Sequence, residues 1–277
     1  MLAWNRYGKS RVRLVKLRRS RDPHEIVDLT VDVQLEGEFD AVYVDGDNAA
    51  CLATDTMKNT VYALARQDPI VSVESFALRL AEHFIATPHV ARVRLTAIEH
   101  RWDRLAVNGQ PHPHAFVQPG GEQWTAVVTA DRDGREVVSG LTGLVVLKTT
   151  DSAFAGFPRD RFTTLPETND RILATSVTAS WRYASATADF SARDRIRAAL
   201  LDTFAAHDSR SVQHTLYAMA ERALAACADL LEITLSLPNR HHLLVDLKPF
   251  GLDNPNEIFV ATDQPYGLIE ATIRRRS

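Results

Sequence analysis

The chain has 277 residues, 45% of them hydrophobic and 24% charged, so it can bury the core of one large domain or of two smaller ones. Its formal net charge of −3 argues against a nucleic acid or an anionic membrane surface as a partner. Two cysteines, Cys51 and Cys227, are too few for a disulfide framework and favour reduced thiols in the cytosol.

Targeting signals are the next feature that the sequence can indicate. No apolar run approaches the roughly 18 residues that a membrane-spanning helix needs. Residues 1–5 do not resemble the start of a signal peptide. Residues 274–277 lack the S-K-L address that directs proteins to peroxisomes. We therefore expect a cytoplasmic protein without a membrane partner.

Patterns of apolar residues predict the elements of the first half of the chain. Residues 11–17 and 26–35 alternate with the period of a strand, and the turn signal Asp22-Pro23 between them predicts an antiparallel pair. The further expected elements are a strand-like run at 39–44, helices at 55–66 and from about 72 to the stop at Thr87-Pro88, strands at 90–100 and 124–131, and a Gly/Pro-rich loop at 108–121.

The second half repeats the order strand-strand-helix-helix-strand-strand. It is expected to contain strands at 136–150 and 171–183, helices at 191–206 and 211–228, strands at 231–237 and 257–261, and an extended run toward residue 273. Asp55 and Asp194 differ by 139 positions, as do Ser72 and Ser211, which supports a repeat. Two ββααββ units predict an α+β protein with antiparallel sheets and helices on one face of each. The predicted domains are residues 1–134 and 135–277.

A helix start near residue 54 is the first candidate binding feature. Thr54 or Asp55 can act as N-cap, because either side chain can accept a hydrogen bond from a first-turn amide. A helix N-terminus offers unpaired N–H groups and a partial positive charge, which suit an anionic, acceptor-rich ligand. Caps are common, so this feature alone indicates only a helix start.

Several separated segments together resemble the urate oxidase (uricase) family. They are Y-G-K at 7–9, L-A-T-D-T-M-K-N-T-V-Y at 52–62, S-A-F-A-G-F at 152–157, D-R-I-L at 170–173, S-V-Q at 211–213 and L-P-N-R-H at 237–241. They occur in the family's order and cover nearly the whole chain. The resemblance implies the tunnelling fold, in which sheets of several subunits join into a barrel with the helices outside. It also implies a homotetramer with active sites at subunit interfaces.

The resemblance also implies roles for particular residues. The residues expected to bind substrate are Thr54, Asp55, Phe154, Arg171, Val212, Gln213 and Asn239. The expected catalytic residues are Lys9, just before the first predicted strand, with Thr54 and His241. These residue types suit a flat anion: a guanidinium presents a planar fork, a phenylalanine ring can stack, and a glutamine amide both donates and accepts.

The implied reaction is urate + O2 + H2O → 5-hydroxyisourate + H2O2, with no metal or organic cofactor. Lys9, acting through Thr54 and relayed by His241, would remove a proton, and the electron-rich dianion would then reduce O2 directly. Asn239 and Thr54 would hold O2 and later water above the ring. Fixed polar groups aimed at developing charge are the usual main source of rate enhancement.

Two other functions and a metal site are alternatives to this interpretation. A pterin-processing enzyme of the same fold would use a glutamate anchor and often zinc, whereas this chain has Gln213 at the corresponding position. A purine-binding protein without activity would have no need of Lys9, Thr54 and His241. The histidine pairs at 112–114 and 241–242 lack the carboxylate or cysteine spacing of a metal site, so we expect none.

Overall fold

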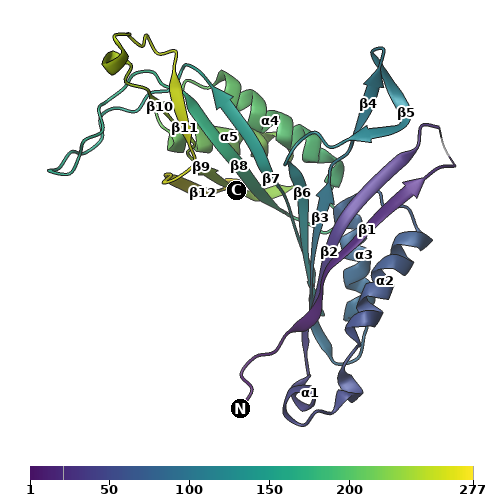
Figure 1. Cartoon of the computed structure of the whole chain (residues 1–277). Helices are drawn as coiled ribbons and strands as arrows, with labels where there is room; N and C mark the ends of the chain where they lie inside the picture. The colour runs from purple at the N-terminus through teal and green to yellow at the C-terminus, as the bar shows by residue number, and fades with distance from the viewer. Residues whose placement is uncertain (21, 277) are drawn as a thin grey trace. The chain divides into compact units, whose positions relative to one another are not determined.

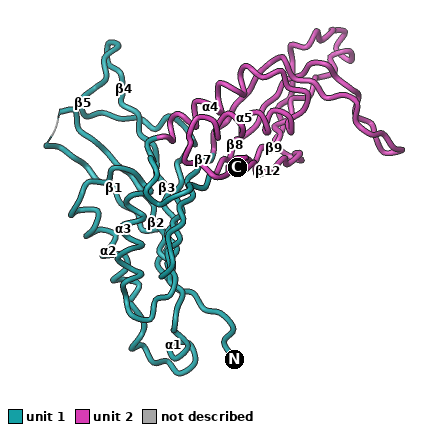
Figure 2. The backbone as a smooth tube through the Cα atoms, turned by 180° about the vertical axis from the view of Figure 1, so that it is seen from behind, with its two compact units in different colours: residues 1–142, 181–191 teal, residues 143–180, 192–277 magenta. Residues whose placement is uncertain are grey.

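A computed structural model describes residues 1–20 and 22–276 of the chain, which form two compact units (Figure 2). Unit 1 comprises Met1–Thr142 and Trp181–Ser191, and unit 2 comprises Gly143–Ser180 and the described residues from Ala192 onward. Ser277, part of the tail considered above, lies outside the described residues. The predicted domains follow the sequence repeat rather than these units, and the division at residue 134 stays a prediction.

Unit 1 is an antiparallel sheet with helices on one face (Figure 1). Its strands lie in the order β1-β2-β3-β6-β7. The elements are β1 (Tyr7–Arg18), β2 (Glu25–Gly37), α1 (Asp40–Val44), the short 3-10 helix η1 (Asn48–Ala50), α2 (Thr54–Gln67), α3 (Val73–Ile85), β3 (Val90–His100), β4 (Asp103–Val107), β5 (Gln110–Val117), β6 (Gln123–Asp131) and the first part of β7 (Arg135–Lys148).

Unit 2 repeats this arrangement, with the strand order β7-β8-β9-β12. Strand β12 pairs antiparallel with β9. The elements are the rest of β7, most of β8 (Leu173–Tyr183), α4 (Arg193–Ala206), α5 (Val212–Ala226), β9 (Leu230–Pro238), β10 (His241–Leu244), η3 (Lys248–Phe250), β11 (Phe259–Thr262) and β12 (Leu268–Arg274). A third short 3-10 helix, η2 (Phe190–Ala192), precedes α4.

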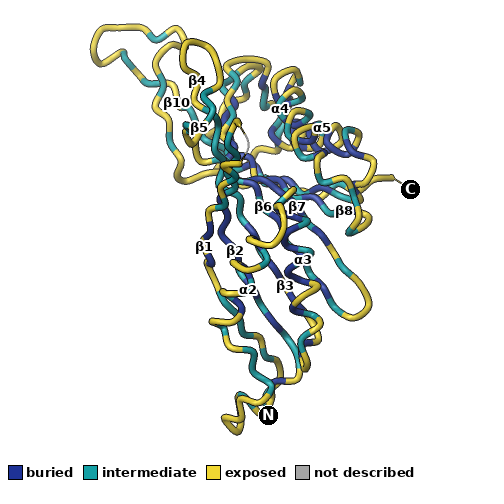
Figure 3. The backbone as a smooth tube through the Cα atoms, turned by 90° about the vertical axis from the view of Figure 1, so that its right-hand side faces the viewer, coloured by how far each residue is buried: buried dark blue, intermediate teal, exposed yellow. Residues whose placement is uncertain are grey.

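The predicted α+β class and tandem ββααββ order are therefore confirmed, with a hairpin inserted before the last strand of each copy. Buried residues concentrate on the central strands and along parts of the helices (Figure 3). In unit 1 the fully buried Val33 and Leu35 of β2 and Leu95 of β3 pack with Phe76 and Leu80 of α3 in one core. Burying such side chains contributes about 1.5–3 kcal/mol each.

Helix α3 begins where its sequence predicted. Ser72 is the N-cap, and its hydroxyl accepts a hydrogen bond from the Ser75 backbone amide at 3.0 Å. In return, the Ser75 hydroxyl accepts a hydrogen bond from the Ser72 backbone amide at 3.2 Å. This reciprocal capping box satisfies two amides that the helix leaves unpaired.

Two local predictions were wrong. Residues 39–44 are not strand-like, because only Phe39 is buried and the chain turns into the exposed helix α1. Residues 108–121 are not a plain loop, because β4 and β5 form a hairpin around Asn108 and Gly109, with φ of 52° and 77°. Positive φ at both turn positions is the conformation that an Asn-Gly hairpin adopts.

Within the described residues, none of the helices combines the length and the apolar character required to cross a lipid bilayer.

Candidate active site

Lys9 lies in β1 beside an irregularity of the strand. The pairing of β1 with β2 shifts register between Lys9 and Val12, and Arg11 inside the shift has φ 57°. A bulge of this kind bends a strand and redirects the side chains next to it. Gly8 allows the two strands to approach, because a Cβ there would lie 1.9 Å from the Val33 carbonyl oxygen. Lys9 was expected before the strand and is instead inside it, half-buried.

Thr54 and Asp55 open helix α2, but neither is its cap. The N-cap is Ala53, and no side chain caps the helix there. The Asp55 carboxylate instead accepts hydrogen bonds from Lys58 Nζ and from Asn59 Nδ2, the second at 2.9 Å. First-turn amides have no partner inside a helix, and the helix dipole is positive at this end. A ligand would therefore meet backbone N–H groups here rather than the Asp55 side chain.

Lys9 is an electrostatic neighbour of this helix start. The pKa of the Asp55 carboxyl is lowered, first by the hydrogen bond from Lys58 and by its charge, and more weakly by Asn59 and Lys9. Asp55 is exposed, so these contacts stabilise the fold little. The influence of Lys9 on Asp55 shows that β1 lies close to the start of α2 in unit 1, where the two elements are in contact.

Tyr7, the first residue of β1, lies close to the segment before α2 and is not among the predicted site residues. Its ring meets Phe39 edge-on, with centroids 4.9 Å apart. Burial first, and then Cys51, raise the pKa of the Tyr7 hydroxyl to about 12, whereas the Leu52 amide lowers it. Tyr7 therefore stays neutral at physiological pH and packs β1 against the segment that leads into α2.

Arg171 and Phe154 meet in unit 2. The Arg171 guanidinium carbon lies 5.2 Å from the centroid of the Phe154 ring. Burial lowers the pKa of the Arg171 guanidinium, which still remains charged at neutral pH. Within the described part of the chain, Arg171 Nε is buried and has no hydrogen-bond partner. A buried donor without a partner is costly, so this nitrogen marks a place for an acceptor from outside.

Asp170 fixes the backbone in front of Arg171. Its carboxylate accepts hydrogen bonds from Thr150 Oγ1 at 2.9 Å and from the Ser152 amide at 3.3 Å. The hydrogen bond from Thr150 is the main cause that lowers the pKa of the Asp170 carboxyl. The segment that contains Phe154 is also held to Thr168, because Phe154 and Thr168 exchange backbone hydrogen bonds of 2.8 and 3.0 Å.

The segment 151–153 also holds the connection that leads into α5. Ser209 donates its amide to Asp151 at 2.9 Å and accepts from Ala153 at 2.7 Å. Ser211 then caps α5, so Val212 and Gln213 occupy its first turn. The Val212 side chain is buried and only its backbone can serve a ligand, whereas the Gln213 side chain is exposed.

Asn239 and His241 lie together between the end of β9 and the start of β10. Asn239 Nδ2 is 3.3 Å from His241 Nδ1. The backbone N–H of Asn239 donates to the Gly267 carbonyl oxygen at 2.8 Å, which fixes the turn between β9 and β10. His241 is the first residue of β10 and pairs with Thr262 of β11.

One cavity of unit 2, of about 840 Å³, brings four predicted residues together: Phe154, Arg171, Asn239 and His241. Its volume is in the range of small-molecule sites. Val212 and Gln213 are not among its lining residues, although the contacts of Ser209 connect their helix with the segment of Phe154. The remaining predicted residues, Lys9, Thr54 and Asp55, belong to unit 1.

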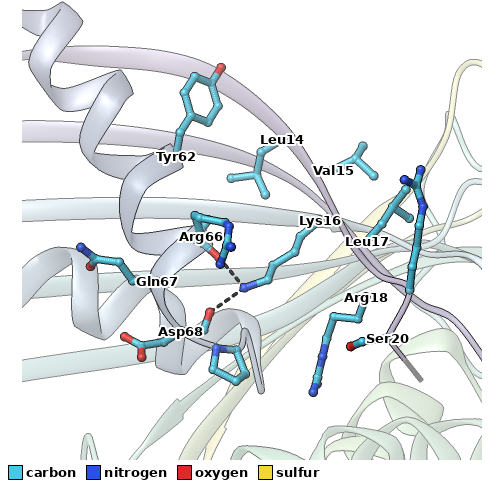
Figure 4. A pocket seen from close by; sticks show the side chains of 13 residues that line it. Leu14, Val15, Lys16, Leu17, Arg18, Ser20, Tyr62, Arg66, Gln67 and Asp68 are labelled. Carbon is cyan, nitrogen blue, oxygen red and sulfur yellow. Dashed lines mark hydrogen bonds between the residues drawn. The ribbon is translucent and has the colours of Figure 1, made fainter.

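Unit 1 has a different cavity, of about 670 Å³, between β1 and the end of α2 (Figure 4). Lys16 Nζ crosses it and donates to the carbonyl oxygens of Ala65 and Asp68, the second at 2.6 Å. A cation at this position satisfies the last carbonyls of a helix and suits its dipole. Since none of the predicted site residues is among the described residues that line it, this cavity is assigned a structural role.

Histidines also gather beside the β4–β5 hairpin. The rings of His112 and His114 lie 4.5 Å apart and those of His24 and His114 5.7 Å apart. Among the described residues, no group of three or more His, Cys, Asp or Glu side chains is arranged to hold a metal ion. The absence of a metal from the reaction stays a prediction.

Comparisons with known proteins extend over the whole chain. The family model described as "Uricase" matches residues 5–129 and 137–270. The uricase of Arthrobacter globiformis is 50% identical over 277 residues, which cover 99% of this chain and 90% of that protein. The uricase of Dictyostelium discoideum is 39% identical over 277 residues, covering 98% and 96%.

Solved structures of uricases are also similar to this chain. The crystal structure of the Arthrobacter globiformis uricase superimposes with a TM-score of 0.94 at 49% identity, covering 99% of this chain and 95% of that one. The urate oxidase of Bacillus sp. TB-90, at 23% identity, has a TM-score of 0.87 over 98% of this chain and 100% of that one, which shows a shared fold.

Proposed function

The chain belongs to the uricase family, and on that premise we propose that it oxidises urate with O2 and water to 5-hydroxyisourate and H2O2, without a metal or organic cofactor. The observation that carries this proposal is the cavity of unit 2, where the positive, partly unpaired Arg171 lies over the Phe154 ring and the pair Asn239 and His241 lines the same space. A flat, anionic heterocycle complements each of these groups.

Substrate binding follows from the chemistry of the groups present. Arg171 would donate to a carbonyl and a deprotonated ring nitrogen of urate, which supplies the acceptor that its buried Nε needs. Phe154 would then stack on the ring face. Gln213 would hold the opposite edge with its amide, assisted by the backbone of Val212 and Asp55. Asp55 suits this role because its carboxylate is already bound to Lys58 and Asn59.

Proton removal would use Lys9, Thr54 and His241 as one relay. The charge of Lys9 acts on Asp55, the residue after Thr54 in unit 1, and His241 lies in the cavity of unit 2. The relay would leave a dianion that gives an electron to O2, while Asn239 and Thr54 hold O2 and later water. A positioned general base contributes about 10²–10⁴-fold to a rate.

The two sets of residues would be completed between copies of the chain. We place Lys9, Thr54 and Asp55 of one subunit and the unit 2 residues of another at each site of a homotetramer. The tunnelling fold, with sheets of several subunits joined into one barrel, provides such interfaces. We also propose that the enzyme is cytoplasmic and that purine degradation is its setting.

The test is to mix the purified protein with urate in air and to follow urate absorbance together with H2O2. The proposal expects one H2O2 for each urate consumed, at the same rate with and without a strong chelator. Turnover that stops with the chelator would show that urate oxidation needs a metal ion and would contradict the cofactor-free reaction. Urate binding without any turnover would identify a binding protein instead.

A further inference from the structure

His207 and His214 form a pair at the connection between α4 and α5. His207 Nε2 lies 3.1 Å from His214 Nδ1, and the ring centroids are 4.3 Å apart. His207 is the C-cap of helix α4. His214 lies in the first turn of α5, directly after Gln213. The pair therefore closes the connection that leads to Val212 and Gln213.

The same connection is held by two other parts of unit 2. Lys148 of β7 donates from Nζ to the His207 carbonyl oxygen at 2.5 Å. Ser209 is paired through its backbone with residues 151–153, directly before Phe154. The connection thus joins the segment of Phe154 to the start of α5, and the histidine contact fixes where α5 begins relative to it.

The chemistry of the pair assigns a role to each ring. A hydrogen bond between two imidazoles needs one N–H and one lone pair. The Arg210 backbone amide donates to His214 Nδ1 at 3.5 Å, so this nitrogen carries a lone pair rather than a hydrogen. This arrangement makes neutral His214 the acceptor and His207 Nε2 the donor. A proton on His214 Nδ1 would remove the acceptor and place two donors against each other.

We propose that His207 and His214 are positioning residues for urate binding: their contact holds the first turn of α5, with Val212 and Gln213, in the binding arrangement while His214 is neutral. The inference rests on the proposed function, because it assumes that Val212 and Gln213 bind urate. It adds that urate binding weakens when both rings are protonated, because the contact then has no lone pair.

The surroundings of the pair lower the pKa of His207 on balance. Burial first, and then the charges of His214 and Lys148, lower the pKa of His207, while Asp208 acts in the opposite direction. Asp151 and Asp170 face Lys148 and partly offset its charge. Because His207 takes up a proton less readily in the folded state than in the unfolded chain, its contribution to stability is retained above a pH of about 6.5 and falls as the pH drops below that value.

The experiment compares two substitutions of His214 by anaerobic urate binding, which needs no turnover. In His214→Asn the amide oxygen can replace Nδ1 as acceptor but cannot titrate, whereas His214→Ala removes the acceptor. At pH 8 we expect His214→Asn to bind like the parent and His214→Ala to bind about 2- to 10-fold more weakly, the worth of one hydrogen bond. His83→Asn, an exposed histidine on α3, is the control and should bind like the parent at every pH.

Acid pH separates positioning from simple structural support. Between pH 8 and 5.5 the parent should lose affinity relative to His214→Asn by the same 2- to 10-fold, and the ratio cancels any ionisation of urate itself. A ratio that stays constant over this range would overturn the inference, also if His214→Ala proves too unstable to measure. A parent that binds no urate would contradict the proposed function, and the inference with it.

Discussion

Arg171 shows how burial gives one side chain its role. Its guanidinium is charged, partly buried and lies over the Phe154 ring, yet its Nε has no hydrogen-bond partner among the described residues. A fold tolerates a buried donor of this kind at a cost, and a bound anion removes that cost. Only the resemblance to the family identified it as a ligand-binding residue, because no local pattern encodes which arginine will be buried.

Replacing this guanidinium tests its role in binding. Loss of a hydrogen bond to a charged group costs about 1.5–3 kcal/mol. Arg171→Gln should therefore weaken anaerobic urate binding about 10- to 150-fold. Arg159→Gln is a matched control, because Arg159 is exposed and lies over Phe157 of the same segment, with its guanidinium carbon 5.7 Å from the ring centroid. An unchanged dissociation constant for Arg171→Gln would remove Arg171 from the site.

The relay makes a second prediction about single residues. Lys9→Met should retain urate binding, since other groups hold the ring, while kcat falls about 10²–10⁴-fold. Members of one relay act as a unit, so their losses do not add. The double substitution Lys9→Met with Thr54→Ala should be little worse than the poorer single one. Losses in kcat that multiply in full, measured at saturating urate and fixed O2, would show that the two residues act independently.

The secondary-structure elements differ in how clearly the sequence announces them. Helix α3 was predictable because Ser72 and Ser75 form a cap within four residues of chain. The β4–β5 hairpin was missed although Asn108-Gly109 is a strong local turn signal, because the surrounding prolines and glycines favoured a loop. The bulge after Lys9 could not be predicted, since it depends on the pairing of β1 with β2.

Strand β1 gives a prediction at this scale. A Cβ at residue 8 would lie 1.9 Å from the Val33 carbonyl oxygen, which belongs to the backbone and cannot rotate away. Gly8→Ala should therefore push β1 from β2 and destabilise the protein by about 1–3 kcal/mol, seen as a lower Tm and as reduced turnover through Lys9. Gly134→Ala, where a Cβ would meet nothing within 4 Å, should leave Tm nearly unchanged. Equal Tm values for both variants would contradict the close approach.

The whole molecule distributes its predicted site residues over two units. Lys9, Thr54 and Asp55 belong to unit 1, and Arg171 with the other lining residues belongs to unit 2. The resemblance to the family predicted both sets of residues, whereas the sequence repeat predicted only the ββααββ order of the elements that carry them. The completion of the site stays a prediction, because it depends on how copies of the chain assemble, and symmetric assembly gives every interface the same pair of halves.

Mixing two inactive variants tests this central claim most directly. Thr54→Ala and Arg171→Gln chains are unfolded, combined in equal amounts and refolded together, and H2O2 release is measured once mixed oligomers have been confirmed. If each site takes Thr54 from one subunit and Arg171 from another, about a quarter of the sites contain both intact residues. Activity should then recover to about a quarter of the parent value. Mixed oligomers that stay as inactive as the separate variants at every ratio would show that each site is built within a single chain.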